Sequence, residues 1–401
     1  MSSERLDYDD AYTTQFTARI AGAGQRAGRP AIELERTYFY PESGGQLADR
    51  GMVGEWRVAD VQSDDHGRVW HLLESEAPGE GEFAARIDWA RRFDHMQQHT
   101  GQHILSAAFE RLLNAPTLSS TLGAEKSVIE VALGEADWPM VERIEEAANS
   151  VVWEDREILR HWENDESVKR FHLRKPPAVT GRIRIVEIPD WDVSACGGTH
   201  TRRTGEVGVI KVLRWERVRG NVRFEFLCGA RALRDHAWRN QALIEAAKRR
   251  TLGDRELIAH LERAAEERDA LKKRLRELMA AVIESEAKEA VGSPPRGVAS
   301  WFAERPREEL RLLVNRCLEG GAPYAVAAAG APEAALVVAR AKGAGADLKR
   351  LLPALLEAAR GKGGGSPDTL QISAADAASA RTAFDLAARE IAKLAAPNSE
   401  S

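Results

Sequence analysis

The alternation of apolar and polar residues changes along the chain, and each change predicts a different kind of domain. Residues 13–90 carry short β-rich segments such as AIELERTYFY and WRVADVQ, which are separated by glycine turns. Such segments are typical of strands that bury one face. The pattern predicts a small β-barrel-like domain with a glycine motif over residues 1–90.

The apolar spacing becomes helical from about residue 91. Five apolar residues follow at the three- and four-residue intervals of one buried helix face: Ile104, Leu105, Ala108, Phe109 and Leu112. A second helical segment and the strand-like segments SVIEVAL, RIRIVEI, VGVIKVL and VRFEFL come after it. Helices and strands in this irregular order predict an α+β domain over residues 91–235.

A heptad pattern marks the next segment, residues 236–291. Its positions carry seven apolar residues and one arginine: Leu257, Leu261, Ala264, Arg268, Leu271, Leu275, Leu278 and Val282. This spacing is typical of helices that pair along a seam. Because the seam is short and contains an arginine, the pattern favours a helical hairpin or a modest dimer contact over a long coiled coil. A homodimer through this segment is therefore one option.

Proline and glycine end the helical segment at GSPPRG, residues 292–297, because proline cannot continue a helix. The apolar segments YAVAAAG and AALVVARA then alternate with helical ones. This alternation predicts a compact α/β domain over residues 292–401. The fold class expected for the whole chain is α+β.

Composition bears on the compartment. No apolar run approaches the roughly 20 residues that a membrane-spanning helix needs, so we expect no membrane partner. The N-terminal segment MSSERLDYDDAYTTQF is acidic where a signal peptide would be basic and then apolar. Three widely spaced cysteines argue against a disulfide framework. These features predict a cytoplasmic protein whose thiols are reduced.

Charge is unevenly distributed along the chain. The net charge is −5, but residues 201–235 carry nine Lys/Arg against four Asp/Glu. A local basic surface of this kind attracts nucleic acid even when the whole protein is acidic. An ordinary solvated sheet face fits the same charge pattern equally well.

Two pairs of residues have the spacing of metal ligands. His99 and His103 lie one turn apart on the predicted helix, so both imidazoles leave the same face. The residue before His103 is Gln102, so the H-E-x-x-H motif of zinc proteases is not present. The second pair, Cys196 and His200, is separated by a tight Gly-Gly-Thr turn. Four N and S ligands predict one tetrahedral zinc ion per chain.

The role of this zinc stays open on chemistry alone. Four protein ligands describe a closed structural site, whereas catalytic zinc usually keeps one position for water. Hydrolysis at this site would require a ligand to dissociate, the coordination number to expand, or the metal only to hold the substrate.

Three ordered motifs resemble the editing region of alanyl-tRNA synthetases and the free-standing alanyl-tRNA editing proteins. They are TYFYPESGGQLADRG (37–51), HMQQHTGQHILSAAF (95–109) and CGGTHTRRTGEVGVIKV (196–212). GKGGGSPDTLQ (361–371) is similar to the glycine-rich signature of the synthetase C-terminal domain, which DHH-family phosphoesterases share. The editing region of threonyl-tRNA synthetase has the two ligand pairs but not the SGGQ-containing domain. The resemblance therefore implies the long form of the alanine editing protein.

The resemblance implies an enzyme, an aminoacyl-tRNA deacylase that acts in trans on tRNA(Ala) mischarged with serine or glycine. The first editing motif begins at residue 37, which leaves no room upstream for an aminoacylation domain, so we expect neither tRNA charging nor a need for ATP. The alternative is a non-catalytic, zinc-stabilised RNA-binding or scaffold protein that kept the editing fold. The sequence decides neither the preferred amino acid nor the oligomeric state.

The resemblance also implies roles for single residues near the zinc. Thr37 matches a threonine that helps to recognise the serine hydroxyl, although strand propensity alone explains a threonine there. Gln102 either orients the attacking water or lies on the helix surface. Gly44, Gly45 and Gln46 either bring backbone amides close to the terminal ribose and ester or form a turn between strands.

Contacts with the tRNA backbone are expected from two regions. Arg202, Arg203 and Lys211 belong to the basic segment that follows the second ligand pair. Lys362 lies in the glycine-rich segment near the C-terminus, which either cradles phosphate with backbone N–H groups or is a flexible loop. The region after residue 235 contains no zinc ligand, so we expect it to supply tRNA affinity rather than chemistry.

Overall fold

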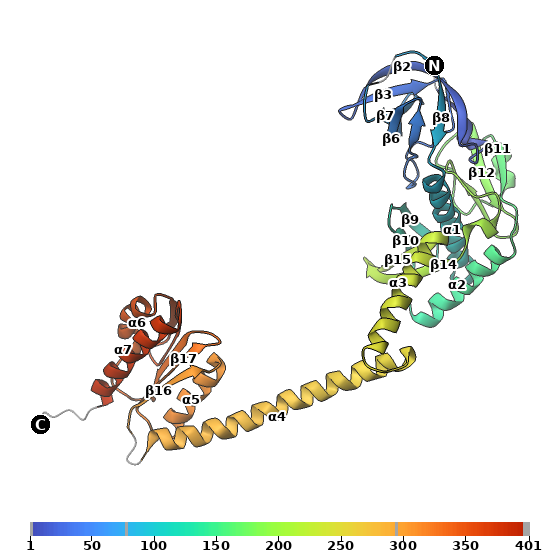
Figure 1. The fold of residues 1–401 in the computed structure, drawn as a ribbon. Helices are drawn as coiled ribbons and strands as arrows, with labels where there is room; N and C mark the ends of the chain where they lie inside the picture. Colours follow the sequence, from blue (N-terminus) through green and yellow to red (C-terminus); the bar gives the residue numbers. More distant parts are fainter. Residues whose placement is uncertain (1–2, 77–78, 293–295, 396–401) are drawn as a thin grey trace, which may run out of the picture. The chain divides into compact units, whose positions relative to one another are not determined.

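The computed structural model describes residues 3–76, 79–292 and 296–395, and the chain divides into two compact units, Met1–Thr251 and Leu252–Ser401 (Figure 1). The expected boundary at residue 235 falls inside α3 (Gly229–Lys248), so the first unit extends further than the pattern of helical and strand-like segments suggested. Among the described residues, no helix is both long and apolar enough to cross a membrane.

The first unit begins with a closed barrel of six strands in the order β2-β3-β7-β6-β5-β8, which confirms the small β-barrel. Its strands are β2 (Gln15–Arg26), β3 (Arg29–Leu34), β5 (Gly51–Val53), β6 (Trp56–Ser63), β7 (Val69–Leu73) and β8 (Gly81–Ile87). Leu34, Val58 and Val61 are fully buried in its interior. A two-residue turn with positive φ at Ala27 and Gly28 joins β2 to β3, which suits the twist of a hairpin.

Helix α1 (Trp89–Leu113) links the barrel to the rest of this unit. It begins at the N-cap Asp88, whose carboxylate accepts a hydrogen bond from the Arg91 amide. Residues 95–109 are buried all around the helix, not on one face as expected, because sheets and the ligand loop surround it. Leu112, expected on the buried face, is 43% exposed because it lies in the last turn, beyond this enclosed stretch.

Two antiparallel sheets complete the first unit. The four-stranded sheet has the order β14-β15-β10-β9, and the three-stranded sheet has the order β11-β12-β13. The strands are β9 (Thr117–Leu122), β10 (Ser127–Val131), β11 (Leu159–Glu163), β12 (Ile183–Ile188), β13 (Asp192–Ala195), β14 (Ile210–Val218) and β15 (Asn221–Cys228). α1 and α2 (Trp138–Trp153) pack against the larger sheet around Phe109 and Phe224. α1 therefore forms a rigid, buried support for any group that it carries.

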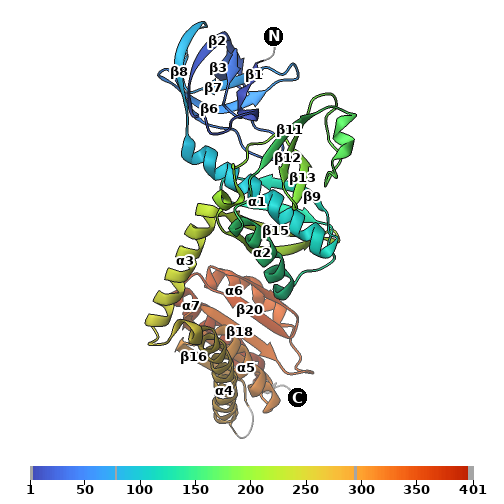
Figure 2. The same cartoon turned by 90° about the vertical axis from the view of Figure 1, so that its right-hand side faces the viewer.

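The second unit is a three-layer α/β/α domain (Figure 2). Its sheet has the order β16-β17-β18-β20-β19, in which only β16 and β17 are parallel. The elements are α4 (Leu257–Val291), β16 (Val298–Glu304), α5 (Arg307–Glu319), β17 (Tyr324–Ala331), β18 (Ala335–Arg340), α6 (Leu352–Ala359), β19 (Lys362–Gly365), β20 (Thr369–Ser373) and α7 (Ala377–Ala395). α4 and α5 cover one face and α6 and α7 the other, so both faces of β17 are buried. This explains the continuous apolar run YAVAAAG.

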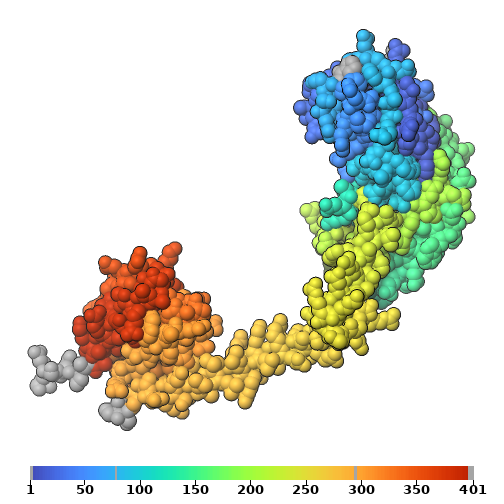
Figure 3. Space-filling model, in the orientation of Figure 1, coloured from blue at the N-terminus to red at the C-terminus, as the bar shows by residue number. Residues whose placement is uncertain are grey.

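The heptad seam lies on one uninterrupted helix, α4, and α3 ends before it, so the expected segment 236–291 contains parts of two helices. A hairpin between them stays a prediction. The C-terminal part of α4 packs into the core of its unit through Ile283, Ala287 and Val291. The seam residues Leu271 and Leu275 are 70% and 59% exposed, and Figure 3 shows this part of α4 standing clear of the body of its own unit. A homodimer through the seam stays a prediction.

Candidate metal centre

The four sequence-predicted ligands meet at one point inside the first unit. His99 and His103 project from α1, while Cys196 and His200 lie in the loop after β13. One ligand atom from each residue lies within 4.8 Å of all the others. The Cys196 Sγ is 3.4 Å from the His99 Nε2 and 3.3 Å from the His200 Nε2. These distances bring the donors close enough to hold one small ion, and the set of one thiolate and three imidazoles fits zinc.

Each imidazole is oriented by a partner at its second nitrogen. The Nδ1 of His99 is 2.7 Å from the Gln46 Oε1, and the Nδ1 of His103 is 2.8 Å from the Asp192 Oδ2. The Nδ1 of His200 is 3.2 Å from the Thr100 Oγ1. Nδ1 bonds of this kind leave Nε2 free for a metal, which is the arrangement of metal-binding histidines.

The electrostatics of the cluster favour a thiolate. Burial by itself raises the pKa of the Cys196 thiol, but the neighbouring His99, His200 and His103 lower it well below its usual value. Burial alone likewise lowers the pKa of His103, yet its hydrogen bond to Asp192 and the Cys196 sulfur raise that pKa to about 9. The lowered pKa favours the thiolate of Cys196, which is the form that binds zinc.

The other two cysteines have a different chemistry. Cys228 and Cys317 are fully buried, and burial raises the pKa of both thiols above the usual value. Neither is within the ligand cluster. Only Cys196 combines a lowered pKa with contact to histidines, so it is the one thiol among the three that is suited to a metal.

Glycine is needed in the ligand loop at one position in particular. A Cβ added at Gly198 would lie 2.1 Å from the His99 Cε1, closer than atoms can approach. At the adjacent Gly197 the nearest atom to an added Cβ is the Tyr8 Cε1, at an ordinary 3.6 Å. The two glycines of the Cys196 motif therefore differ: Gly198 makes room for a ligand ring, and Gly197 does not.

We expect Gly198→Ala to weaken zinc binding by at least about tenfold, because the His99 ring must leave its position, an effect comparable to loss of an outer-shell partner. Gly197→Ala is the matched control and should retain the wild-type affinity. Competition titration with a chromophoric chelator measures both. Equal zinc affinities in the two variants would contradict the close approach of Gly198 to His99.

A cavity of about 220 Å³ is lined by three of the four ligands, His99, His103 and Cys196. Its lining includes Gln102 of α1, Gly44, and two cations, Arg174 and Lys175. The Gln102 Nε2 donates to the Ser106 Oγ at 2.8 Å, and its Oε1 has no partner among the residues that the structure describes. A free amide oxygen beside the ligands can accept a hydrogen bond from a water molecule.

The glycine motif has a mixed outcome. Gly44 lines the cavity with φ of 56°, and Gly45, with φ of 83°, lies so close to β9 that an added Cβ would be 2.8 Å from the Ser120 carbonyl oxygen. Gln46 is buried and bonds to His99 and to Thr199, so its side chain supports a ligand instead of facing the cavity. Of the three, the structure places only Gly44 at the cavity surface.

Thr37 is not brought to the cavity. It is fully buried in β4 (Arg36–Thr37), and its Oγ1 lies 2.9 Å from the His71 Nε2 and accepts from the Phe39 amide at 3.0 Å. Both of these bonds serve the interior of the barrel. The resemblance placed Thr37 next to the aminoacyl group, whereas its hydroxyl is bonded to His71 in this structure. Its role at the substrate stays a prediction.

The predicted backbone-binding cations of the first unit each have an acidic neighbour. Arg203 is 2.6 Å from Asp155, and Lys211 is 2.5 Å from Glu145. The Arg202 guanidinium stacks on a tyrosine ring and lies 3.8 Å from Asp10. These pairs reduce the positive field that the sequence suggested at this segment. Lys362 is exposed on β19, with no ion pair among the described residues.

Sequence analysis missed the residues that orient the ligands. Asp192 lies four positions before Cys196 and also accepts from the Arg174 Nε at 2.7 Å, yet a single aspartate in a polar segment gives no warning of burial. Thr100 follows His99 directly, and its hydroxyl reaches His200, which is distant in sequence. The only feature of the sequence that points to Asp192 and Thr100 is that each lies within four positions of a ligand.

Comparison with known proteins places the chain near tRNA editing domains. The family described as "Threonyl and Alanyl tRNA synthetase second additional domain" matches residues 183–224, which include Cys196 and His200. The alanyl-tRNA editing protein AlaX-L of Pyrococcus horikoshii is 39% identical over 57% of this chain and 59% of its own length. The alanine–tRNA ligase of Pyrococcus abyssi is 32% identical over 95% of this chain and 43% of its own length, and that of Halobacterium salinarum 33% over 84% and 38%. The chain thus spans about three-fifths of the editing protein and less than half of each ligase.

Proposed function

We propose that this chain, a relative of the alanyl-tRNA editing proteins and of alanine–tRNA ligases, hydrolyses the ester of tRNA(Ala) mischarged with serine or glycine. The observation that carries the proposal is the cluster of four ligands beside a cavity that holds Gln102 and two cations. The similarity extends through both units, which supports tRNA as the substrate. This substrate would place the protein in the cytoplasm.

The reaction needs a water molecule, an activated carbonyl and a place for the developing charge. Zinc held by His99, His103, Cys196 and His200 would polarise the ester carbonyl if one ligand gives way to substrate. In the proposed reaction water attacks the carbonyl carbon, the bond to the ribose 3′-oxygen breaks, and that oxygen takes the proton. The products are the free amino acid and uncharged tRNA.

The residues of the chain divide this work in the proposal. The Gln102 Oε1 accepts a hydrogen bond from the attacking water, and the backbone at Gly44 approaches the ester closely. Gln46 acts as a positioning residue, because it holds the His99 ring in place. Arg174 and Lys175 attract the terminal phosphate of the tRNA.

Recognition of the serine hydroxyl is assigned to side chains at the cavity, since Thr37 is committed to His71. Ser43, Thr117 and Ser120 supply hydroxyl groups there. A site that hydrogen-bonds a substrate hydroxyl discriminates against an analogue without it better than an apolar pocket does against an added one. The second unit, including Lys362, contributes affinity for the body of the tRNA in this proposal.

The test is a deacylation assay with the full chain, in which Ser-tRNA(Ala), Gly-tRNA(Ala) and Ala-tRNA(Ala) are compared. We expect hydrolysis of the mischarged tRNAs, with Ala-tRNA(Ala) spared. Gln102→Ala should lower kcat by roughly 100-fold, in the range for a positioned acid or base, and keep the zinc. Gln62→Ala, an exposed glutamine on the barrel, is the control. A zinc-loaded wild-type protein that accelerates none of the three reactions would favour the non-catalytic RNA-binding alternative.

A further inference from the structure

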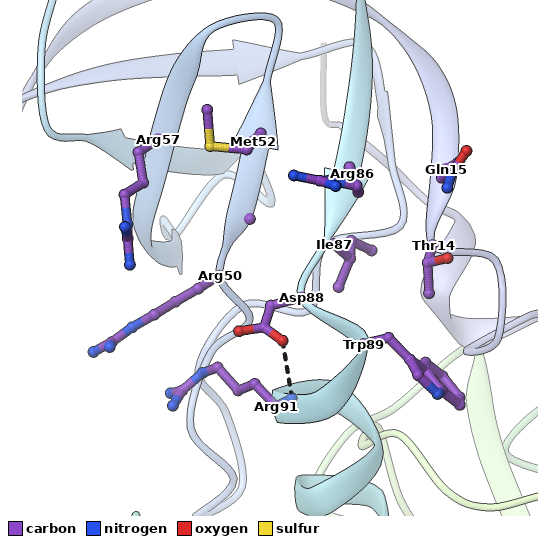
Figure 4. Close-up of a pocket in the computed structure, with 11 residues that line it drawn as sticks. Thr14, Gln15, Arg50, Met52, Arg57, Arg86, Ile87, Asp88, Trp89 and Arg91 are labelled. Carbon is purple, nitrogen blue, oxygen red and sulfur yellow. Dashed lines mark hydrogen bonds between the residues drawn. The ribbon is translucent and has the colours of Figure 1, made fainter.

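An arginine-lined cavity lies on the barrel, outside the metal centre. It has a volume of about 600 Å³ and is lined by Arg50, Arg57, Arg86, Arg91 and the rim residue Trp89, among others. Figure 4 shows the guanidinium groups of Arg50, Arg57 and Arg91 on the left of the view, with that of Arg86 pointing toward them from the centre. None of these arginines belongs to the segment in which the sequence predicted a basic surface.

Strand register brings two of these cations together. Arg57 of β6 pairs with Met52 of β5, Met52 pairs with Arg86 of β8, and Arg86 pairs with Gln15 of β2. Directly paired residues point to the same face of a sheet, so this row lies on the outside of the barrel. With neighbouring strands about 4.8 Å apart, Arg57 and Arg86 start roughly 10 Å from one another. That separation suits more than one anionic group.

The cations in this cavity are poorly neutralised. Arg50 and Arg86 are exposed and have no ion pair or side-chain hydrogen bond within residues 3–76, 79–292 and 296–395. Arg57 lies 3.3 Å from Glu74 in an exposed pair, and the Arg91 Nε donates to a backbone carbonyl. Burial and the charge of Arg50 lower the pKa of Arg91, and the opposite effect of Asp49 and Asp88 does not cancel this.

The lining has one carboxylate, Asp88, against four guanidinium groups. Asp88 caps α1 by accepting from the Arg91 amide at 3.2 Å (Figure 4). The Asp88 carboxylate therefore interacts with the N-terminus of α1 and its helix dipole as well as with the arginines. Four guanidinium groups around a cavity with one carboxylate favour a polyanionic ligand.

The cavity is connected to the metal centre by α1 and by the segment that precedes the barrel strand β5. Arg91 and Gln102 lie about three turns apart on the same face of α1, which separates them by about 16 Å along the helix. The segment from Gly44 to Arg50 runs between the same two sites, with Gly44 at the metal cavity and Arg50 at the arginine cavity. A polynucleotide whose 3′ end lies at the metal centre can therefore reach the arginines.

We propose that this arginine cavity binds backbone phosphates of the tRNA substrate, upstream of the 3′ end that enters the metal centre. The proposal rests on the proposed function for the identity of the RNA. Arginine forks match phosphate oxygens in pairs. The partly exposed Trp89 ring, which lies beside Tyr12 and Phe93, adds an aromatic edge to the same cavity.

The test compares Arg50→Ala/Arg86→Ala with the control Arg19→Ala/Arg36→Ala. Both double variants remove the same charge from the barrel, but Arg19 and Arg36 already pair with Glu35 and Glu4. Binding of deacylated tRNA(Ala) is measured by fluorescence anisotropy between 50 and 200 mM KCl. We expect Arg50→Ala/Arg86→Ala to bind about tenfold more weakly at the middle of this range, and the slope of log K against log salt to fall by about 1.5. The control should stay within about twofold of the wild type.

Further arms separate this proposal from its alternatives. Arg50→Lys/Arg86→Lys should restore most of the salt dependence, which a merely unfolded variant would not show. Wild-type salt slope in Arg50→Ala/Arg86→Ala would overturn the proposal. The proposal would also be wrong if inorganic tripolyphosphate bound tightly and tRNA did not displace it, because the ligand of the cavity would then be a small phosphate compound. Because the probe is deacylated tRNA, the result stands even if ester hydrolysis is never observed.

Discussion

Cys196→Ala is expected to release zinc from the protein and to abolish ester hydrolysis with it. The Cys196 Sγ lies within 3.4 Å of two histidine nitrogens, and those histidines lower the pKa of the thiol well below its usual value, so the thiolate is the main charge of the ligand set. Zinc held by four such ligands contributes on the order of 10 kcal/mol or more, and removal of the only anionic ligand should lower affinity by at least about 1000-fold.

The measurement is zinc per chain by elemental analysis, alongside deacylation of Ser-tRNA(Ala). Cys317→Ala is the control, because it removes a buried thiol in the second unit, away from the ligands. It should keep one zinc per chain. One zinc per chain in purified Cys196→Ala would show that zinc binds outside the cluster of His99, His103, Cys196 and His200.

A smaller loss of zinc affinity is expected when a residue that orients a ligand is changed. Asp192→Asn keeps the shape of the side chain but replaces the carboxylate that orients His103. Outer-shell substitutions of this kind lower metal affinity by roughly 10- to 100-fold. Full loss of zinc in Cys196→Ala and a partial loss of zinc affinity in Asp192→Asn would together identify Cys196 as a ligand and Asp192 as a residue that orients one.

The second large effect is expected at a buried ion pair that joins α1 to the loop before β5. Arg92 and Asp49 are both fully buried, and the Arg92 Nε lies 3.0 Å from both Asp49 oxygens. The Arg92 Nη1 donates to the Ala11 carbonyl at 2.6 Å, and the Asp49 Oδ2 accepts from the Tyr40 amide at 2.7 Å. Asp49→Ala would leave the guanidinium without its counter-charge, and we expect it to lower the free energy of unfolding of the first unit by about 3–5 kcal/mol.

Denaturant unfolding followed by tryptophan fluorescence measures this change. Nine of the ten tryptophans precede residue 252, so the signal reports mainly the first unit. Arg19→Ala removes half of an exposed pair on the same barrel and should cost less than about 1 kcal/mol. A midpoint shift in Asp49→Ala no larger than in this control would mean that the buried pair is replaced by water or by a new contact.

The ligand pairs show which part of the site was predictable. His99 and His103 are neighbours because a helix turns every 3.6 residues, and Cys196 and His200 are neighbours because two glycines tighten their loop. Spacing of this kind is local, so the two ligand pairs can be predicted without knowledge of the fold. Their convergence on one point depended on the packing of β13 beside α1, which no local pattern contains.

Thr37 shows the opposite case. Its residue type and its motif suggested a hydroxyl at the substrate, but the barrel turns that hydroxyl toward His71. A strand alternates its side chains between two faces, and the face that a residue occupies is set by register with strands elsewhere in the chain. Gln46 was likewise assigned to substrate from its motif, and the fold directs it to His99.

The sequence by itself determined the strand-rich and helical segments, the heptad spacing of the seam, and the chemistry of the four ligands, because all of these follow from residue type and short-range periodicity. The tertiary structure decided which polar groups meet. Asp192 joins His103, and Arg50, Arg57, Arg86 and Arg91 gather from the segment before β5, two strands and a helix. Such meetings depend on strand register and on the packing of segments distant in the chain, and a periodicity read over one or two turns carries no information about either.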